Sequence, residues 1–370
     1  MNKAMNARDW VGHSLARREL ATPAYYFNLQ AIVDDIARVR ALLGGNVLQE
    51  VAACPLQEML SRLPEPERFG AITSSRGELN MVAGWDTDHA YVYLAGLTPQ
   101  LTRAVLGVGH RLIVESPAQI EGLVKVRGQR KVMPLMLSVH PSLVMPGAGG
   151  HLGMLRETLM QAVARAVEYG LVIDGLALAH KGAFDSDRAI AALDGMRALA
   201  TDVERQTGRA AHRLIMGEWT DILHTAQDTA PYRAVVEAGP HDEILTHVGG
   251  LSIFERAGVL VTRVVDVQPG TDGPRATCDA VVRGDFRANP ALDGPRNLSR
   301  DTLGQQVTTL TGTTARDGAT LGTTLSEVQV GDEIAFDGLG AYFRGFDPVV
   351  ALEGKQLPAL LFFDEEAADA

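Results

Sequence analysis

Short apolar runs alternate with amphipathic stretches from about residue 25 to residue 251. Segments such as 31–43, 154–169 and 188–207 carry apolar residues at helical spacing and therefore predict helices that cover a core. Between the amphipathic stretches lie apolar runs, bounded by turn residues, that predict eight strands: 47–51, 69–73, 91–94, 112–114, 132–139, 173–178, 213–216 and 234–237. This alternation favours a (β/α)8 barrel, whose chemistry sits at the C-terminal ends of the strands.

The pattern changes after about residue 255. Short β-type runs follow one another there, separated by Gly, Pro and Asp turns with little helix between them: 260–268, 275–283, 305–311, 333–336 and 359–363. We therefore expect an α/β plus β fold, with a TIM-type (β/α)8 barrel over residues 28–255. Residues 1–27 and 256–370 together are expected to form an antiparallel β-domain.

Composition narrows the range of functions. The chain has 370 residues, of which 46% are hydrophobic and 21% charged, and its net charge is −11. A negative balance argues against a nucleic-acid surface, which needs clustered Lys and Arg. Two cysteines, Cys54 and Cys278, form no disulfide framework. With no apolar run of membrane-spanning length and no signal-peptide pattern, we expect a cytoplasmic protein.

Several short motifs occur in order over residues 20–345. They are Thr22-Pro23 with the aromatic residues that follow, Ser75-Arg76-Gly77-Glu78-Leu79, Glu115-Ser116, Ala179-His180-Lys181-Gly182, Glu237-Ala238-Gly239-Pro240 and Gly340-Ala341-Tyr342. This ordered set resembles the fold-type III pyridoxal-phosphate decarboxylases, the family of ornithine, diaminopimelate and arginine decarboxylases. The resemblance implies an alanine racemase/ornithine decarboxylase-like architecture. It also implies a homodimer with its sites near the subunit interface.

The family's cofactor forms a Schiff base with a lysine on the first barrel strand, and the matching stretch here, Val51-Ala52-Ala53-Cys54, has Ala52 at the lysine position. Backbone N–H groups of a glycine-rich turn hold the phosphate in the family, whereas this chain places Glu218 there. The arginine of a late "EPGR" motif becomes Pro240. The interface Cys and acidic residue become Ala315 and Ala319. We therefore expect no covalent pyridoxal phosphate.

Other cofactor-site positions of the family are kept. By resemblance, His180 would stack on the pyridine ring and Glu237 would pair with its nitrogen, while Gly239 and Tyr342 remain as vestigial cofactor-binding positions. Lys181 could serve as an unorthodox anchor for pyridoxal phosphate. Because adjacent strand residues point to opposite faces, we instead expect Lys181 to face solvent if His180 faces inward.

Polar residues at predicted strand ends could replace the cofactor. A divalent metal could be held by four of them: His140, His180, Glu218 and Glu237. Alternatively, His180 with Glu237 or Glu218 could act as a general acid–base pair without a cofactor. His241 and His247 are expected on loop and helix surfaces, and Cys54 as a buried structural thiol. The 146–153 stretch lacks the Lys-Ser/Thr of a P-loop and predicts a flexible active-site loop.

Three functions stay open at this point. The first is a biosynthetic enzyme of lyase type, with a repurposed pocket, that acts on an amino-acid-like small molecule without a pyridoxal-phosphate Schiff base, either with or without a metal. The second is a pyridoxal-phosphate-dependent amino-acid decarboxylase anchored through Lys181. The third is a non-catalytic homologue that regulates or scaffolds. None of the three involves nucleic acid or membrane.

Overall fold

The computed structural model describes residues 20–63, 70–85, 89–128, 130–223, 229–280, 295–300, 303–313, 320–341 and 359–363. The chain divides into two compact units, each described here by itself. One is Asp35–Ser252, and the other combines Met1–Asp34 with Ile253–Ala370. The sequence-based division placed the barrel at residues 28–255. Within the described residues, no helix combines the length and the apolar character needed to cross a membrane.

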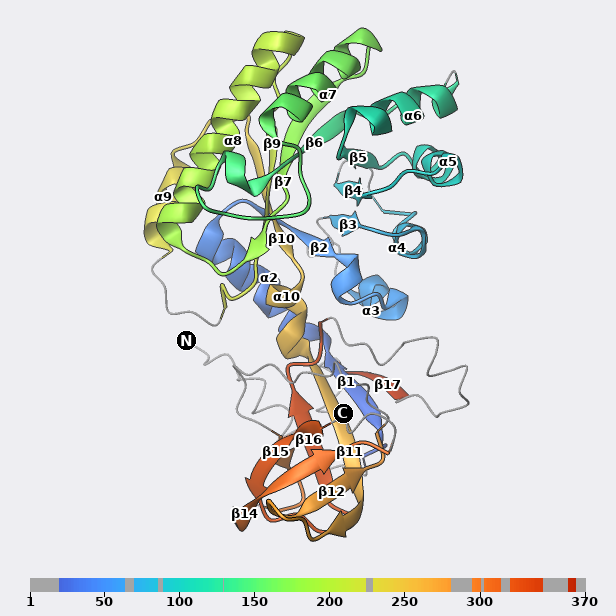
Figure 1. Cartoon of the computed structure of the whole chain (residues 1–370), viewed down its shortest axis with the longest axis vertical. Helices are drawn as coiled ribbons and strands as arrows, with labels where there is room; N and C mark the ends of the chain where they lie inside the picture. Colours follow the sequence, from blue (N-terminus) through green and yellow to red (C-terminus); the bar gives the residue numbers. More distant parts are fainter. Residues whose placement is uncertain are drawn as a thin grey trace. The chain divides into compact units, whose positions relative to one another are not determined.

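The first unit is a closed parallel barrel (Figure 1). Its eight strands are β2 (Asn46–Glu50), β3 (Ala71–Thr73), β4 (Ala90–Tyr93), β5 (Arg111–Val114), β6 (Leu135–Val139), β7 (Ile173–Leu178), β9 (Arg213–Trp219) and β10 (Ile244–Gly249). Each strand pairs with the next around the ring, and β10 closes it by pairing with both β9 and β2. A two-residue strand, β8 (Lys181–Gly182), pairs only with β9. The predicted barrel is confirmed.

Helices alternate with the barrel strands along the chain, from α2 before β2 to α10 after β10 (Figure 1). They are α2 (Leu29–Leu43), α3 (Gln57–Arg62), α4 (Arg76–Met81), α5 (Pro99–Val108), α6 (Pro117–Arg127), α7 (Arg156–Glu168), α8 (Ser186–Thr207), α9 (Ala230–Glu237) and α10 (Leu251–Phe254). Three single-turn 3-10 helices are η2 (Val51–Ala53), η3 (Pro141–Leu143) and η4 (Glu255–Ala257). Local sequence sets several starts: Ser75, Thr98 and Ser116 each cap a helix with a side-chain oxygen.

Inside the barrel, apolar side chains from six strands form one layer: Leu48, Tyr91, Ile113, Met136, Ala177 and Ile215. Nearer the strand starts, a buried ionic group closes the barrel floor. Asp174 Oδ2 lies 3.1 Å from Arg111 Nε and 3.3 Å from Arg213 Nε, and Arg213 Nη1 donates to the Tyr91 hydroxyl at 3.3 Å. This group and the apolar layer pack the part of the barrel nearer the strand starts, below the C-terminal strand ends where barrel chemistry is expected.

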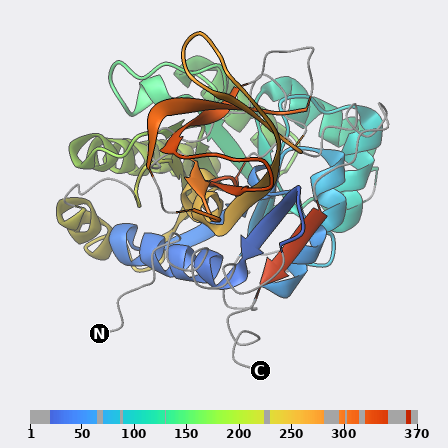
Figure 2. The ribbon, with the colours of Figure 1, turned by 90° about the horizontal axis from the view of Figure 1, so that it is seen from below.

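The second unit is a mixed, mostly antiparallel sheet. Its strands are β1 (Ala24–Asn28), β11 (Gly258–Gln268), β12 (Arg275–Cys278), β13 (Arg296–Asn297), β14 (Leu303–Thr311), β15 (Thr320–Ser326), β16 (Glu333–Asp337) and β17 (Ala359–Phe363). N-terminal strand β1 pairs antiparallel with β11 and parallel with β17, and Figure 2 shows β1 and β17 side by side. The expected antiparallel β-domain is confirmed, and β1 adds an N-terminal strand to its sheet.

One predicted strand is wrong. Residues 234–237 lie in α9, because Pro231 suits a first helical turn and the less exposed positions 232, 235 and 236 follow helical spacing. The eighth barrel strand is β10, further along the chain. Two strands of the second unit, β13 and β15, were not predicted from the sequence.

Candidate functional site

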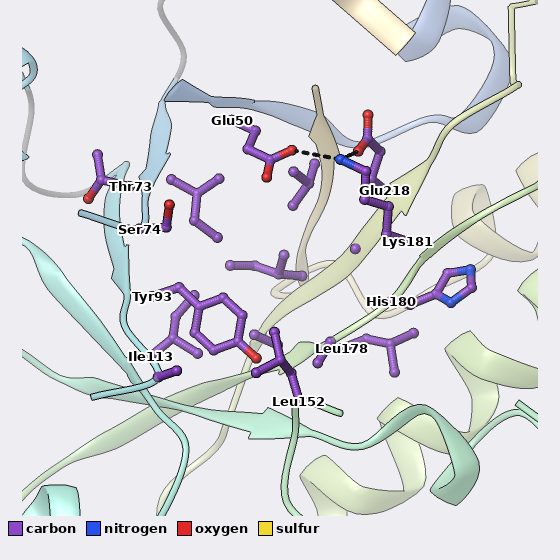
Figure 3. A pocket seen from close by; sticks show the side chains of 17 residues that line it. Glu50, Thr73, Ser74, Tyr93, Ile113, Leu152, Leu178, His180, Lys181 and Glu218 are labelled. Atoms are coloured by element: carbon purple, nitrogen blue, oxygen red, sulfur yellow. Dashed lines mark hydrogen bonds and ion pairs between the residues drawn. The ribbon is translucent and has the colours of Figure 1, made fainter. Parts of the chain in front are cut away.

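A cavity of about 360 Å³ opens at the C-terminal ends of the barrel strands. Its wall is largely apolar, with Ile72, Ile113, Leu152, Leu178, Ile215 and Val248 among its lining residues. Its polar lining residues are Glu50, Thr73, Ser74, Tyr93, His180, Lys181 and Glu218. Figure 3 shows these side chains, with Glu50, Lys181 and Glu218 gathered on one side and Tyr93 on another. An apolar cavity with a few convergent polar groups has the character of a small-molecule site.

An ammonium group between two carboxylates forms the charged part of the cavity. Lys181 Nζ lies 2.7 Å from Glu218 Oε2 and 3.3 Å from Glu50 Oε2 (Figure 3). The three side chains differ in exposure: 46% for Lys181, 26% for Glu50 and 2% for Glu218. Two carboxylates and one ammonium leave a formal charge of −1, and Glu50 and Lys181 can be reached from solvent.

Strand register explains why these groups meet. Lys181 is the direct partner of Glu218 in the β8–β9 pairing, so their side chains project next to each other. The β9–β10 register shifts near Gly217, whose φ is +75°. This irregularity resets the alternation of side chains along β9, so Ile215 and Glu218 both reach the cavity. A side chain at Gly217 would also collide with the carbonyl oxygen of His180.

Glu218 has further partners on the backbone. Its Oε1 accepts hydrogen bonds from the N–H of Gly250 at 3.0 Å and of Ser252 at 3.4 Å, where the chain leaves β10 and α10 begins. Both donors are buried. The carboxylate therefore has protein partners on both oxygens, which offsets the cost of burying its charge.

Lys181 corrects an expectation, because it lies in the cavity together with His180. The alternation argument fails here, since β7 ends at Leu178 and residues 179 and 180 belong to no strand. The His180 ring packs on Trp219, with centroids 4.7 Å apart, and Figure 3 shows it directed away from Lys181 and Glu218. Burial lowers the pKa of His180, and the positive charge of Arg188 adds to that effect. The predicted pairing of His180 with Glu218 is therefore replaced by the pairing of Lys181 with Glu218.

A second polar group lies on the Tyr93 side of the cavity. The Tyr93 hydroxyl donates a hydrogen bond to Glu115 and lies 2.9 Å from the Ser138 hydroxyl. Glu115 also accepts the N–H of Gly153, at 3.0 and 3.2 Å for its two oxygens. This contact holds the loop that carries Leu152 into the cavity lining. Burial raises the pKa of Tyr93 well above its usual value, and the contact with Glu115 adds to that effect.

Two predicted metal ligands lie elsewhere. His140 caps η3, with Nδ1 2.7 Å from the Ser142 hydroxyl and Nε2 3.2 Å from the Gly150 carbonyl oxygen. Glu237 ends α9, where it forms an exposed ion pair with Arg233 at 2.7 Å. Neither lines the cavity, so the expected set of His140, His180, Glu218 and Glu237 is not assembled. In the described part of the chain, no three His, Cys, Asp or Glu residues are grouped as a metal site requires.

The expected cofactor positions are also scattered. Ala52 lies in η2, just past the strand, and the residue that β2 contributes to the cavity lining is Glu50. Gly239 follows α9 and packs against Arg197. Tyr342, Ala315 and Ala319 fall outside the described residues. The "EPGR" match at residues 237–240 was placed on the wrong element, because the last barrel strand ends at Gly249.

The burial of the remaining candidate residues, Cys54, His241 and His247, decides whether each can take part in the site. Cys54 is fully buried beside Met59, and burial raises the pKa of its thiol far above the usual value. His241 is exposed in a turn. His247 contradicts the expected surface position: it is completely buried in β10, where desolvation lowers its pKa to about 3. It packs edge-on against Tyr232.

Sequence reasoning overlooked Tyr93 and Ser138 as site residues. Both belong to predicted strands, and Tyr93 ends β4 while Glu115 directly follows β5. Since the ends of parallel barrel strands converge, a polar residue at each end was the available signal.

By sequence, no family model and no curated protein matches the chain. By structure, it is similar to a lysine/ornithine decarboxylase from Vibrio vulnificus complexed with putrescine, with a TM-score of 0.80, 15% identity and coverage of 98% of this chain and 100% of the other. It is similar to the Paramecium bursaria Chlorella virus arginine decarboxylase bound to agmatine, with a TM-score of 0.79, 14% identity and coverage of 95% and 99%. A third similar structure is diaminopimelate decarboxylase from Helicobacter pylori complexed with L-lysine, with a TM-score of 0.75, 17% identity and coverage of 89% and 88%. The chain has the fold of these fold-type III decarboxylases.

Proposed function

We propose that the barrel cavity is the active site of an enzyme that acts on an amino-acid-like small molecule without a pyridoxal-phosphate Schiff base. The observation that carries this proposal is the Lys181 ammonium held between Glu50 and Glu218 at the mouth of an apolar cavity. The proposal keeps the decarboxylase-like fold and assigns its pocket a different set of working groups.

The substrate class follows from size, charge and fold. A cavity of about 360 Å³ lies at the small end of the range for ligand sites and suits a molecule of amino-acid size. Glu50 can accept a substrate amine and Lys181 can pair with a substrate carboxylate, while the apolar wall takes an aliphatic chain. Enzymes of the same fold are decarboxylases of lysine, ornithine, arginine and diaminopimelate.

The cavity fits pyridoxal phosphate poorly. Of the lysines in the described residues, only Lys181 lines the cavity, and its nitrogen is paired with two carboxylates. Imine formation requires this nitrogen to attack the aldehyde of the cofactor, and both ion pairs already engage it. The backbone N–H groups of Gly250 and Ser252 already serve Glu218. A phosphate near them would meet a buried carboxylate, and like charges repel strongly in a dry site.

Proton transfer is the chemistry that the residues themselves can supply. Lys181 can donate a proton to an oxygen or carbon of the bound molecule, and Glu50, which is partly open to solvent, can accept one. Glu218 would hold Lys181 in place through the 2.7 Å contact. The Tyr93 hydroxyl, fixed by Glu115 and Ser138, faces the same cavity and can orient the substrate.

A second function is supported by a specific observation. Because Lys181 Nζ does lie in the cavity, a pyridoxal-phosphate-dependent amino-acid decarboxylase anchored on this residue is the alternative. A metal-dependent version loses support, since His140 and Glu237 lie away from the cavity. The homodimer, the cytoplasmic location and the non-catalytic homologue remain proposals that rest on the resemblance and the composition.

Ligand binding tests the proposal directly. L-Lysine, L-ornithine, L-arginine, putrescine and cadaverine would be titrated calorimetrically into the wild-type protein, a Lys181→Met variant and a Lys125→Met control. Lys125 is an exposed lysine on α6, away from the cavity. We expect at least one ligand to bind wild type and control equally, and to bind Lys181→Met about tenfold or more weakly, as for the loss of one charged hydrogen bond. Equal ligand binding to all three proteins would show that Lys181 does not contact the ligand. The absence of ligand binding to any of them would favour the non-catalytic homologue.

A further inference from the structure

Among the described residues, the polar contacts of the Glu218 carboxylate are with hydrogen-bond donors and one cation. Its Oε1 faces the N–H groups of Gly250 and Ser252, at 3.0 and 3.4 Å, and its Oε2 faces Lys181 Nζ at 2.7 Å. Two neutral donors and one cation converging on one small anion is the arrangement by which proteins bind oxyanions. Here the anion belongs to the chain itself.

These donors are part of the barrel framework and are not arranged by Glu218. Gly250 follows directly on β10, which is fixed by pairing with both β9 and β2. Lys181 is held opposite residue 218 by the backbone register between β8 and β9. Removal of the Glu218 side chain would therefore leave the two backbone N–H groups without an acceptor and Lys181 with Glu50 as its partner, at a buried position beside the cavity.

We propose that Glu218 is a built-in replacement for an external oxyanion. It occupies a latent phosphate position in the cavity and thereby restricts the pocket to ligands without a phosphate group. This inference concerns the pocket of the proposed function but rests on the contacts of Glu218 alone, so it holds whether or not the pocket is catalytic. It identifies one side chain as the cause of the poor fit to a phosphorylated cofactor.

Inorganic phosphate can take the place of the Glu218 carboxylate, because both are anions that accept hydrogen bonds through oxygen. A phosphate dianion offers more acceptor oxygens than a carboxylate, and the Glu218→Gly change frees the space of a three-carbon side chain next to the open cavity. The Glu218→Gln variant is the matched control. Its side chain has almost the same volume and keeps an oxygen toward Gly250 and Ser252, so it still fills the position without the charge.

Inorganic phosphate is the probe. Its binding would be measured by calorimetry at constant ionic strength, with chloride as the balancing anion, for wild type, Glu218→Gly, Glu218→Gln and the double variant Glu218→Gly with Lys181→Met. We expect Glu218→Gly to bind phosphate at least tenfold more tightly than wild type and Glu218→Gln. The added Lys181→Met change should reverse most of that gain. A folded Glu218→Gly protein with wild-type affinity for phosphate would overturn the proposal.

Folding provides a second readout. If phosphate takes the place of the carboxylate, it should raise the midpoint of thermal unfolding of Glu218→Gly and leave wild type and Glu218→Gln unchanged. A Glu218→Gly chain that cannot be recovered folded, even in the presence of phosphate, would also count against the proposal, because the substitute anion would have failed to fill the position. Amino-acid binding by the wild-type protein is measured separately, so failure of the proposed function leaves this result readable.

Discussion

The Nζ atom of Lys181 lies 2.7 Å from Oε2 of Glu218, a carboxylate that is almost completely buried. Backbone register places these residues side by side, and Glu50 approaches the same ammonium from β2. The pair fixes the charge of the cavity and its capacity for proton transfer. It also takes up the amine and the backbone donors that a phosphorylated cofactor would need.

Removing the cation should destabilise the fold. In Lys181→Met, the buried carboxylate of Glu218 loses its ion pair and keeps only its two backbone hydrogen bonds. Because Lys181 is half exposed and solvent screens the pair, we expect a loss of about 1–2 kcal/mol in the free energy of unfolding, below the cost for fully buried pairs. Denaturant unfolding measures it. In the Lys181→Met, Glu218→Gln double variant, part of this loss should be recovered, and strict additivity would show that the two residues do not interact.

The barrel floor should depend strongly on Asp174. This carboxylate faces both Arg111 and Arg213, and all three side chains are largely buried. In Asp174→Asn two guanidinium groups lose their shared counter-charge, and we expect a loss of about 3–5 kcal/mol in the free energy of unfolding. Asp194→Asn, on the exposed side of α8, is the control and should cost under about 0.5 kcal/mol. Similar losses in the two variants would contradict the role of the floor.

Stability should fall in mild acid because of His247. Its pKa is about 3 in the folded protein, owing to complete burial, against an ordinary value near 6.5. Between these values the unfolded chain binds a proton that the folded chain does not. The stability that depends on neutral His247 is therefore fully present above about pH 6.5, and it is lost as the pH falls toward the folded-state pKa. One such group contributes a slope of up to about 1.4 kcal/mol per pH unit.

Paired substitutions isolate this effect. His247→Leu should reduce the pH dependence of the free energy of unfolding, by up to the amount that one titrating group contributes. The free energy of unfolding would be measured between pH 7 and pH 5. His241→Leu changes an exposed histidine and should leave the slope as it is. An unchanged slope in His247→Leu would assign the acid sensitivity to His110 and His180, whose pKa values burial also lowers.

The loop that carries Leu152 should loosen when Glu115 is shortened. Glu115→Ala leaves both the N–H of Gly153 and the Tyr93 hydroxyl without their acceptor. We expect hydrogen exchange at the Gly153 amide to accelerate at least about tenfold, the equivalent of one lost hydrogen bond of about 1.4 kcal/mol. Glu121→Ala, which removes a partly exposed carboxylate on α6 that pairs with Arg165, should not change it. Equal exchange in all three proteins would show that the loop is held by other contacts.

The hydrophobic periodicity of the sequence was sufficient to predict the architecture, but not to predict which strand-end residues line the cavity. Seven of the eight barrel strands were predicted close to their observed positions, because strands that are buried on both faces read as continuous apolar runs. The eighth was missed: residues 234–237 form an equally apolar run, but one that is folded as helix. That single error carried Glu237 and Gly239 into the predicted site and left β10 out of it.

Side-chain direction was the other limit. The motif match placed Ala52 at the position of the family's lysine. In the structure, Glu50, two residues earlier at the end of β2, lies in the cavity lining instead. Strict alternation turned Lys181 outward, but the chain leaves β7 before residue 179, so alternation did not apply. Glu218 was correctly placed at a strand end, yet its backbone partners at Gly250 and Ser252 depend on closure of the barrel by β10, which no local pattern encodes.

Reduction with borohydride tests the central claim most directly. The purified protein would be incubated with pyridoxal phosphate, reduced, digested and mapped by mass spectrometry, with Lys181→Met treated in parallel and the absorbance spectrum and metal content recorded on the same sample. We expect no stoichiometric pyridoxyl adduct at Lys181 and no imine absorbance beyond that of Lys181→Met. A stoichiometric adduct on Lys181, absent from the variant, would contradict the account and establish a pyridoxal-phosphate enzyme with a relocated anchor.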